Sequence, residues 1–166
     1  MLILTPEALE TIREHSRRGY PLEICGLLAG SVDGDARTVT AVWPVRNSWE
    51  EDAEERARLI AAMEASGAQS AGGWDDFSEE RRFLVSPADM LQAMKRERAE
   101  GVKVVGVYHT HPNHPAQPSQ FDLDAAWPEW SYLILSVRGG EVAEERSWVL
   151  NEAEGRFVEE QVLTER

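Results

Sequence analysis

The chain has 166 residues, of which 42% are hydrophobic and 28% are charged, and its formal net charge at pH 7 is −13. This length fits one domain with a real core, and the composition is that of an ordinary globular protein. The negative charge argues against nucleic acid, whose phosphates must be met by Lys and Arg, and against an anionic membrane surface. It aids solubility and can favour basic partners, so it identifies no partner by itself.

The cytoplasm is the expected compartment. The single cysteine, Cys25, excludes an internal disulfide framework and fits a reducing cytosol. Residues 1–6 have no basic segment and too short an apolar stretch for a signal peptide. No apolar run approaches the roughly 18 residues that a membrane helix needs. We therefore expect a cytoplasmic protein that does not cross a membrane.

The first part of the chain predicts a helix followed by a β-hairpin. Residues 5–18 favour a helix, because Thr5 can cap it and Pro6 suits the first helical position. Residues 23–30 are mostly apolar and are punctuated by two glycines, which indicates a buried strand. An Asp-Gly-Asp turn and the alternating residues 38–45 then predict that a second strand pairs with the first.

Residues 48–80 interrupt this regular pattern. The segment carries many acidic residues, and its stretch 56–65 has helix-forming composition. We expect one domain over 1–166 with an acidic insertion at about 48–80, formed by a helix and a loop. The loop has two open interpretations: Trp74 and Phe77 form part of a lid or groove wall, or the loop is a solvated segment without a role.

A short strand at 82–85 and a helix at 86–100 are predicted after the insertion. Ser86 and the following proline are a typical helix start, and a glycine follows the last helical residue. The apolar face of this helix is expected to contain Met90, Leu91 and Met94.

The last part of the chain predicts mainly strands. Residues 102–108 are almost wholly apolar, as expected for a strand that is covered on both faces, and 132–137 predict another buried strand. Residues 147–150 and 156–162 are expected to form closing strands. Because hairpins alternate with helical crossovers, we expect an α/β fold with a mixed β-sheet flanked by helices.

Two histidines and an aspartate have the spacing of a metal site. His109 and His111 follow the strand at 102–108 and point the same way, because residues i and i+2 of a strand share a face. Asp122 comes eleven residues later, after a proline-rich loop that can turn back, and Ser119 or Asp122 can cap a short helix there. Three protein ligands and one water are typical of a catalytic zinc. A bare His-x-His pair is also common among surface histidines, so spacing alone leaves both interpretations open.

A hydrolytic zinc site needs a base that takes a proton from water and passes it to the leaving amine. Glu23 is the candidate, because it is an acid at the head of an apolar strand. Ser119 lies three residues before Asp122, and its hydroxyl could donate a hydrogen bond to the oxyanion of a tetrahedral intermediate.

Other reactive or aromatic residues have simpler interpretations. We expect His114 to be a surface residue or a substrate contact, because the three ligands are complete without it, and His15 to be structural or on the surface. No pattern pairs Cys25 with a base, so we expect a small buried residue. Trp127 and Trp130 either shape a groove or only pack, and packing is the simpler expectation.

These motifs together resemble the signature of the JAMM (JAB/MPN-domain) metalloproteases. That signature is an upstream Glu, then His-Ser/Thr-His, seven residues and Ser-x-x-Asp, and the stretch from His109 to Asp122 fills every position with the right gap. Residues 21–30 resemble the family's Pro-x-Glu-x-Cys-Gly-Leu-Leu-x-Gly strand. The resemblance extends to 105–108 and 132–136, so it covers nearly the whole chain except the insertion.

The resemblance implies a cytidine-deaminase-like (JAB/MPN) fold and a zinc ion (Zn²⁺) on His109, His111 and Asp122, with Glu23 as acid/base and Ser119 as oxyanion support. It implies a zinc metallopeptidase of the short prokaryotic type, which cleaves peptide or isopeptide bonds after the C-terminal Gly-Gly of ubiquitin-like or sulfur-carrier proteins. Two alternatives remain: a non-catalytic MPN-type scaffold or protein-binding module, and a zinc hydrolase of another amide. The sequence does not indicate the oligomeric state.

Overall fold

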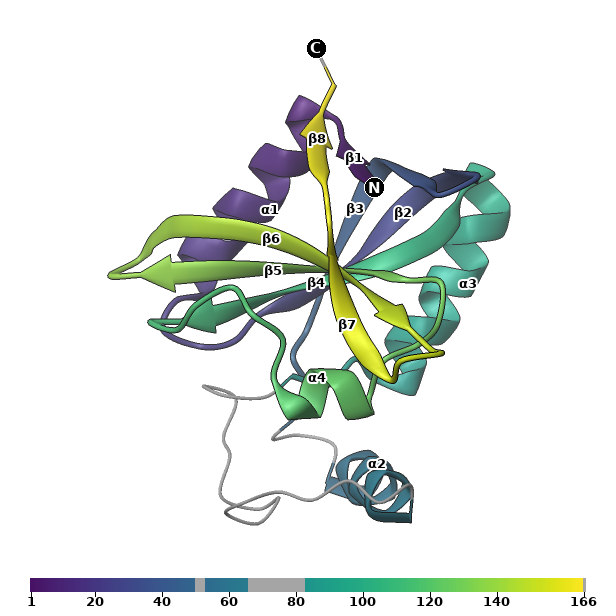
Figure 1. Cartoon of the computed structure of the whole chain (residues 1–166), viewed down its shortest axis with the longest axis vertical. Coiled ribbons are helices and arrows are strands. Elements are labelled where there is room, and N and C mark those ends of the chain that lie inside the picture. The colour runs from purple at the N-terminus through teal and green to yellow at the C-terminus, as the bar shows by residue number, and fades with distance from the viewer. Residues whose placement is uncertain (50–52, 66–82, 166) are drawn as a thin grey trace.

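A computed structural model describes residues 1–49, 53–65 and 83–165 of the chain. Its elements follow the expected mixture of hairpins and crossovers (Figure 1). In chain order they are β1 (Leu2–Leu4), α1 (Pro6–Gly19), β2 (Cys25–Asp33), β3 (Ala36–Val45), α2 (Ala53–Ala65), α3 (Pro87–Glu100), β4 (Lys103–Pro112), α4 (Gln120–Asp124), β5 (Ser131–Arg138), β6 (Glu141–Asn151), β7 (Arg156–Glu160) and β8 (Val162–Thr164). The loop of the insertion, with Trp74 and Phe77, lies outside the described residues, so the lid interpretation stays a prediction.

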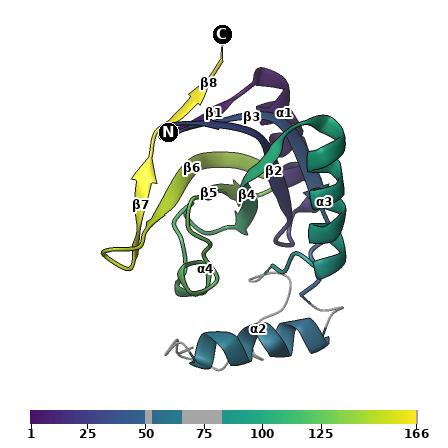
Figure 2. The same ribbon diagram turned by 90° about the vertical axis from the view of Figure 1, so that its right-hand side faces the viewer.

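All strands join one mixed sheet in the order β7-β6-β5-β4-β2-β3-β1-β8. The central pair, β4 and β5, is parallel, and β2 pairs antiparallel with both β3 and β4. The two edge strands, β7 and β8, are consecutive in the chain and are separated only by Gln161. The sheet therefore curls until one stretch of chain serves both edges, and Figure 2 shows β7 leading up into β8. The predicted single closing strand at 156–162 is in fact these two strands.

The helix α1 covers one face of the sheet. The Thr5 hydroxyl accepts a hydrogen bond from the Ala8 amide at 3.1 Å, which confirms the expected cap. The buried side chains of α1 and those facing them form a closed apolar cluster, which includes Leu2, Leu4, Leu9, Ile12, Leu28, Tyr108, Leu133 and Leu135. Burial of this much apolar surface is the main reason that α1 stays on the sheet.

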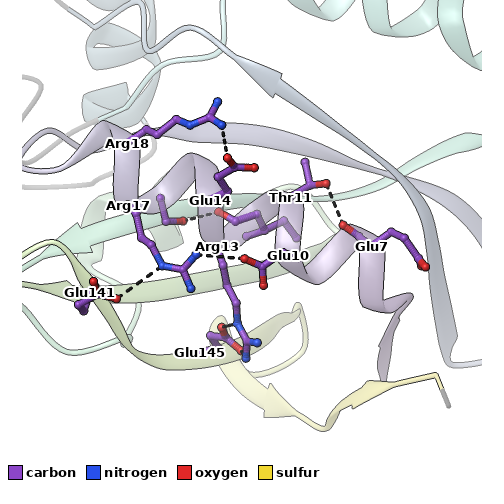
Figure 3. A network of polar contacts seen from close by, with 11 residues as sticks. Glu7, Glu10, Thr11, Arg13, Glu14, Arg17, Arg18, Glu141 and Glu145 are labelled. Atoms are coloured by element: carbon purple, nitrogen blue, oxygen red, sulfur yellow. Dashed lines mark hydrogen bonds and ion pairs between the residues drawn. The ribbon is translucent and has the colours of Figure 1, made fainter.

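Ion pairs tie the outer side of α1 to the neighbouring strand β6 (Figure 3). Arg13 makes a two-pronged contact with Glu145, at 2.5 and 3.0 Å. Arg17 lies 3.6 Å from Glu141 and 3.1 Å from Glu10 of its own helix. Glu141 and Glu145 belong to the part of β6 that was not predicted as a strand, because its charged residues hide the alternating pattern.

The helix α3 covers the other face, since the adjacent residues Leu27 and Leu28 of β2 point to opposite clusters. The Ser86 hydroxyl accepts from the Asp89 amide at 3.1 Å and Gly101 ends the helix in a left-handed conformation, so both predicted ends are correct. The predicted apolar face was partly wrong. Met90 packs inward beside Ala93, whereas 53% of Leu91 and 51% of Met94 are exposed, so α3 buries only a narrow apolar stripe.

The predicted strand at 82–85 is also corrected by the structure. Residues 83–86 form no strand. The Leu84 carbonyl accepts from the Ser48 amide at 2.9 Å, but the Leu84 amide donates to the side chain of Asn47 at 3.1 Å. The side chain of Asn47 thus occupies the Leu84 amide, which a β-strand would need for pairing with its neighbour. The segment therefore stays irregular beside the sheet.

An irregularity in β4 decides which residues face the site. Leu28 pairs with Gly106 and Ala29 pairs with Val104, so Val105 is an extra residue in β4. After this bulge, Tyr108 points into the α1 cluster, while residues 107, 109 and 111 point to the α3 side of the sheet. Among the described helices, none is long and apolar enough to cross a membrane.

Candidate metal centre

His109 and His111 lie in the last four residues of β4, which continues to Pro112, so the prediction that they sit at the end of this strand is confirmed and the strand is longer than the predicted 102–108. Both point to the same face, and their Nε2 atoms are 3.1 Å apart. His109 is fully buried, and its ring stacks on Phe83 with a centroid distance of 4.4 Å. The Nδ1 atom of His111 lies 2.9 Å from the Pro115 carbonyl. A proton donated there leaves Nε2 with a free lone pair that points into the site.

Asp122 reaches the two histidines from α4. Ser119 caps this helix: its hydroxyl accepts from the Asp122 amide at 3.1 Å, while Asp122 Oδ2 accepts from the Ser119 amide at 2.6 Å and its hydroxyl at 2.7 Å. This reciprocal capping box fixes the carboxylate. Asp122 Oδ1 then lies 3.2 Å from His109 Nε2, and Oδ2 lies 3.7 Å from His111 Nε2.

The spacing of these three side chains fits a zinc ion. Their ligand atoms all lie within 4.8 Å of one another, and the closest pairs are 3.1, 3.2 and 3.7 Å apart. In a tetrahedral site with bonds of about 2.0–2.2 Å, neighbouring ligand atoms are about 3.3–3.6 Å apart. Two nitrogens and one carboxylate oxygen also match the donors of catalytic zinc sites, which keep a further position open.

The pKa values of the three groups agree with this assignment. Burial lowers the pKa of His109 more than Asp122 raises it. Burial also acts to lower the pKa of His111, but its hydrogen bond to Asp122 and the nearby carboxylates raise that pKa overall. Burial would raise the pKa of Asp122, yet the two histidines hold it well below its usual range. Asp122 is therefore ionised at neutral pH and offers a charged ligand to a cation.

Glu23 lies beside this group, as the sequence predicted, just before β2 begins. Only 6% of it is exposed, and its Oε1 atom is 3.9 Å from His111 Nε2. The structure thus brings Glu23, His109, His111, Ser119 and Asp122 together at one place. Their chemical roles remain predictions.

The sequence did not indicate Asn47, which positions Glu23. Its side-chain amide donates to the Glu23 carbonyl at 2.9 Å, and its oxygen accepts from the amides of Trp49 and Leu84, each at 3.1 Å. Asn47 therefore joins the segment before β2 to both ends of the insertion. An asparagine in a loop has no periodicity or spacing that would have identified it.

A small apolar cluster lies where the insertion leaves the sheet. Trp49, Leu84 and Phe121 are buried together, and Ile60 of α2 packs against them. The rings of Trp49 and Phe121 meet edge to face at 5.3 Å. Since Phe121 belongs to the same short helix as Asp122, this cluster couples α2 to the helix that holds a metal ligand.

An apolar pocket of about 260 Å³ adjoins the metal ligands. Asp122 and Phe83 belong to both the pocket and the site, and Trp127 and Trp130 also line it. The simpler expectation, that these tryptophans only pack, was wrong for Trp127, which is 62% exposed. Phe83 was not singled out as a site residue, because a lone aromatic after an irregular insertion has no distinctive pattern.

The remaining candidates are not among the three residues whose ligand atoms gather, although Cys25 of β2 pairs with His109 of β4. His114 is exposed, and Cys25 is buried with its thiol pKa raised by burial. His15 lies on the opposite face of the sheet, where its Nδ1 atom is 2.7 Å from the Tyr108 hydroxyl. All three agree with the simple roles expected for them.

Comparison with known proteins identifies the family. A family model described as prokaryotic homologs of the JAB domain matches residues 5–151. The chain is 34% identical to the desampylase of Haloferax volcanii over 156 residues, which cover 87% of this chain and 86% of that protein. It is 35% identical over 57 residues to a probable TtuB-protein conjugate cleaving protease of Thermus thermophilus, covering 34% and 38% of the two chains. The chain therefore belongs to the prokaryotic JAB-domain family, as its motifs predicted.

Solved structures support the fold. The solution structure of a protein from Desulfitobacterium hafniense matches with a TM-score of 0.74 and 28% identity, over 100% of this chain and 94% of that one. The crystal structure of a JAB1/MPN domain protein from Archaeoglobus fulgidus matches with a TM-score of 0.51 and 15% identity, over 100% and 98% of the two chains. The predicted α/β class, with a mixed sheet flanked by helices in the JAB/MPN arrangement, is confirmed.

Proposed function

We propose that this protein is a zinc-dependent isopeptidase that cleaves after the C-terminal Gly-Gly of ubiquitin-like or sulfur-carrier proteins in the cytoplasm. The observation that carries the proposal is the convergence of two imidazoles and a carboxylate, with the buried Glu23 3.9 Å from one of them. Relatives named as a desampylase and a conjugate cleaving protease support the substrate class. The metalloprotease domain would comprise 1–166, with the insertion at about 48–80 as part of it.

His109, His111 and Asp122 would hold the zinc ion, since their donor types and separations fit it. When bound, zinc would supply Lewis acidity, which polarises a carbonyl and makes a nearby water more acidic. The protein's own contribution is to keep these three ligands fixed. The capping box orients Asp122, and the Pro115 carbonyl orients His111.

Glu23 is the general acid/base in this proposal. Its carboxylate accepts a proton from the attacking water and later donates it to the nitrogen of the leaving lysine or peptide amine. The side-chain amide of Asn47 donates to the backbone carbonyl of Glu23 and so fixes the backbone from which the carboxylate extends. Burial of Glu23 keeps this proton transfer away from bulk water.

Ser119 has a second role besides capping α4. Its hydroxyl donates to Asp122 Oδ2 at 2.7 Å, and the Ser119 amide donates to the same oxygen at 2.6 Å. The hydroxyl can therefore rotate toward an oxyanion while the amide still satisfies Asp122. We assign Ser119 as the donor that supports the oxyanion of the tetrahedral intermediate.

Intact mass spectrometry of cleavage tests the proposal. Zinc-loaded protein would be mixed with ubiquitin-like and sulfur-carrier proteins, each extended beyond Gly-Gly by cysteine, a short peptide or a lysine-linked target. We expect a mass loss at Gly-Gly that a chelator abolishes and that Glu23→Gln slows by about 10²- to 10⁴-fold.

The Glu23→Gln variant is the matched control, because it keeps the size of the side chain and all three ligands. It should bind zinc as the wild type does. If every substrate stays intact although zinc is bound, the isopeptidase assignment fails. If binding of a ubiquitin-like protein persists without cleavage, the scaffold alternative replaces it.

A further inference from the structure

The apolar pocket beside the metal ligands is suited to one large side chain. An enclosed cavity of about 150 Å³ lined by aliphatic and aromatic groups is enough to bind benzene. The pocket here measures about 260 Å³, and its walls include Leu27, Met90, Val107 and Phe121. It can therefore hold one aromatic or leucine side chain together with part of its backbone.

The chemistry of the walls excludes a charged occupant. Of the described residues that line the pocket, Asp122 alone carries a charge, and its carboxylate is engaged by Ser119 and the two histidines. An ammonium or carboxylate that entered would lose its hydration without gaining a partner of opposite charge from the described lining. An apolar side chain would gain free energy in proportion to its buried area.

Two tryptophans form an ordered rim at this pocket. Trp127 and Trp130 stack with their centroids 5.7 Å apart and their planes 19° apart. The Trp127 amide donates to the Tyr132 hydroxyl at 2.5 Å, and Arg37 donates to the Glu129 carbonyl at 2.7 Å, so the loop that carries both rings is anchored at two points. Yet 62% of Trp127 is exposed. Fixed, exposed aromatic side chains are typical of binding surfaces.

We propose that this pocket binds one large apolar side chain in the C-terminal tail of the ubiquitin-like protein, shortly before its Gly-Gly, and that Trp127 and Trp130 determine specificity for it. The inference rests on the proposed function. The pocket is continuous with the metal centre, because Asp122 lines both and Phe83 stacks on His109. Two glycines offer no side chain for recognition, so selectivity has to come from residues further back in the tail.

The tail fits the pocket better than the other side of the scissile bond does. In an isopeptide that side carries a lysine, whose nitrogen leaves as an amine and takes up a further proton at neutral pH to become cationic. The described lining has no free acid to receive that charge. The tail residue is also the same in every conjugate of one ubiquitin-like protein, so a fixed pocket can select it.

A substitution scan of the tail tests this inference. Each of the three residues before Gly-Gly would be changed in turn to Phe, Leu, Ala or Glu in a ubiquitin-like substrate, and kcat/KM would be measured with the zinc-loaded full chain. We expect one position at which Ala lowers kcat/KM by about 10- to 100-fold relative to Phe or Leu, with Glu lower still. Equal rates for Phe and Ala at all three positions would overturn the inference.

Enzyme variants test whether the pocket causes the preference for Phe or Leu over Ala in the substrate tail. Trp127→Ala should remove most of the difference in kcat/KM between the Phe and Ala substrates, so that the ratio of the two values approaches one. Met94→Ala is the matched control, because it also truncates an exposed apolar side chain, on α3 and outside the pocket. If Trp127→Ala keeps the wild-type ratio, the tryptophans do not determine specificity.

A binding assay separates this inference from the proposed function. Peptides that end in Gly-Gly, with Phe or Ala at each of the same three positions, would be titrated by calorimetry into the zinc-loaded chain. Tighter binding of a Phe peptide by about tenfold or more, lost in Trp127→Ala, would establish the pocket even if nothing is cleaved. Equal binding of both peptides would remove the pocket assignment even if conjugates are cleaved normally.

Discussion

The two faces of β4 carry opposite kinds of residue, although they belong to one strand. Tyr108 points to the α1 face, into a closed cluster of apolar side chains. His109 and His111 point to the other face, where they meet Asp122, Glu23 and an apolar pocket. The α1 face is filled with apolar side chains, whereas the face with the histidines is partly open. Residues that stabilise the fold and residues proposed for catalysis therefore lie on opposite sides of one sheet.

This separation has a physical cause. A metal site needs polar side chains that are buried yet able to reach a substrate, and each such group costs free energy unless it is partnered. The α1 face offsets this cost, because it buries large apolar side chains in a closed cluster. On the site face, the capping box of Ser119 and Asp122 and the side-chain amide of Asn47 supply such partners. Substitutions on the two faces should therefore have different consequences.

The largest effect on stability is expected for Leu133→Ala on the α1 face. Leu133 is fully buried in the apolar cluster, so its truncation should lower the free energy of unfolding by about 2–5 kcal/mol. Chemical denaturation measures this change. Zinc content and kcat per folded molecule should stay the same, and a large loss of either would contradict the separation of the two faces.

A smaller and mixed effect is expected for Asn47→Ala on the site face. The variant leaves the buried amides of Trp49 and Leu84 without their acceptor, which should cost about 1–3 kcal/mol of unfolding free energy. Cleavage should slow as well, because the Glu23 carbonyl loses its donor. Asn47→Asp is the control: it keeps the acceptor and loses the donor, so an equal loss of stability in both variants would refute this role.

Zinc affinity should fall as the pH is lowered. The pKa of His111 is raised above its ordinary value, so in the metal-free protein this ring begins to take up a proton above pH 6.5, and zinc must displace that proton. Asp122 stays ionised because its pKa is held well below the usual range. Competition with a chromogenic chelator should show a loss of up to about tenfold per pH unit for each proton displaced. A constant affinity between pH 7.5 and pH 5.5 would contradict it.

The smallest effect is expected for the ion pairs on the outer side of α1 (Figure 3). Arg13→Gln should lower the free energy of unfolding by less than about 1 kcal/mol, because 37% of the Arg13 side chain is exposed and water screens its contact with Glu145. A double-mutant cycle with Glu145→Gln isolates the pair. A coupling far above that value would mean that charge, and not apolar burial, holds α1 on the sheet.

The sequence predicted those parts of the molecule that are governed by local rules. Thr5 and Ser86 are caps whose partners lie three residues away, so both helices could be recognised. The spacing of His109 and His111 follows from the period of a strand. The apposition of Asp122 and Glu23 depends on pairing between distant segments. Their positions in the sequence made them candidates, and the family resemblance strengthened the prediction that they belong to one site.

Other features depend on tertiary structure alone. The strand β1 has three residues and is stabilised by its pairing with β3 and β8, so no local pattern reveals it. The charged half of β6 is a strand because its backbone pairs with β5, and its acids then meet the arginines of α1. Asn47 positions Glu23 through contacts with segments up to 37 residues away in sequence.

Crystallography of the zinc-loaded protein at the zinc absorption edge tests the central claim most directly. We expect one anomalous peak at about 2.0–2.2 Å from His109 Nε2, His111 Nε2 and a carboxylate oxygen of Asp122, with Glu23 outside the ligand set. Asp122→Ala crystals should lack this peak. A zinc ion bound elsewhere, or one that takes Glu23 as a ligand in place of Asp122, would contradict the account.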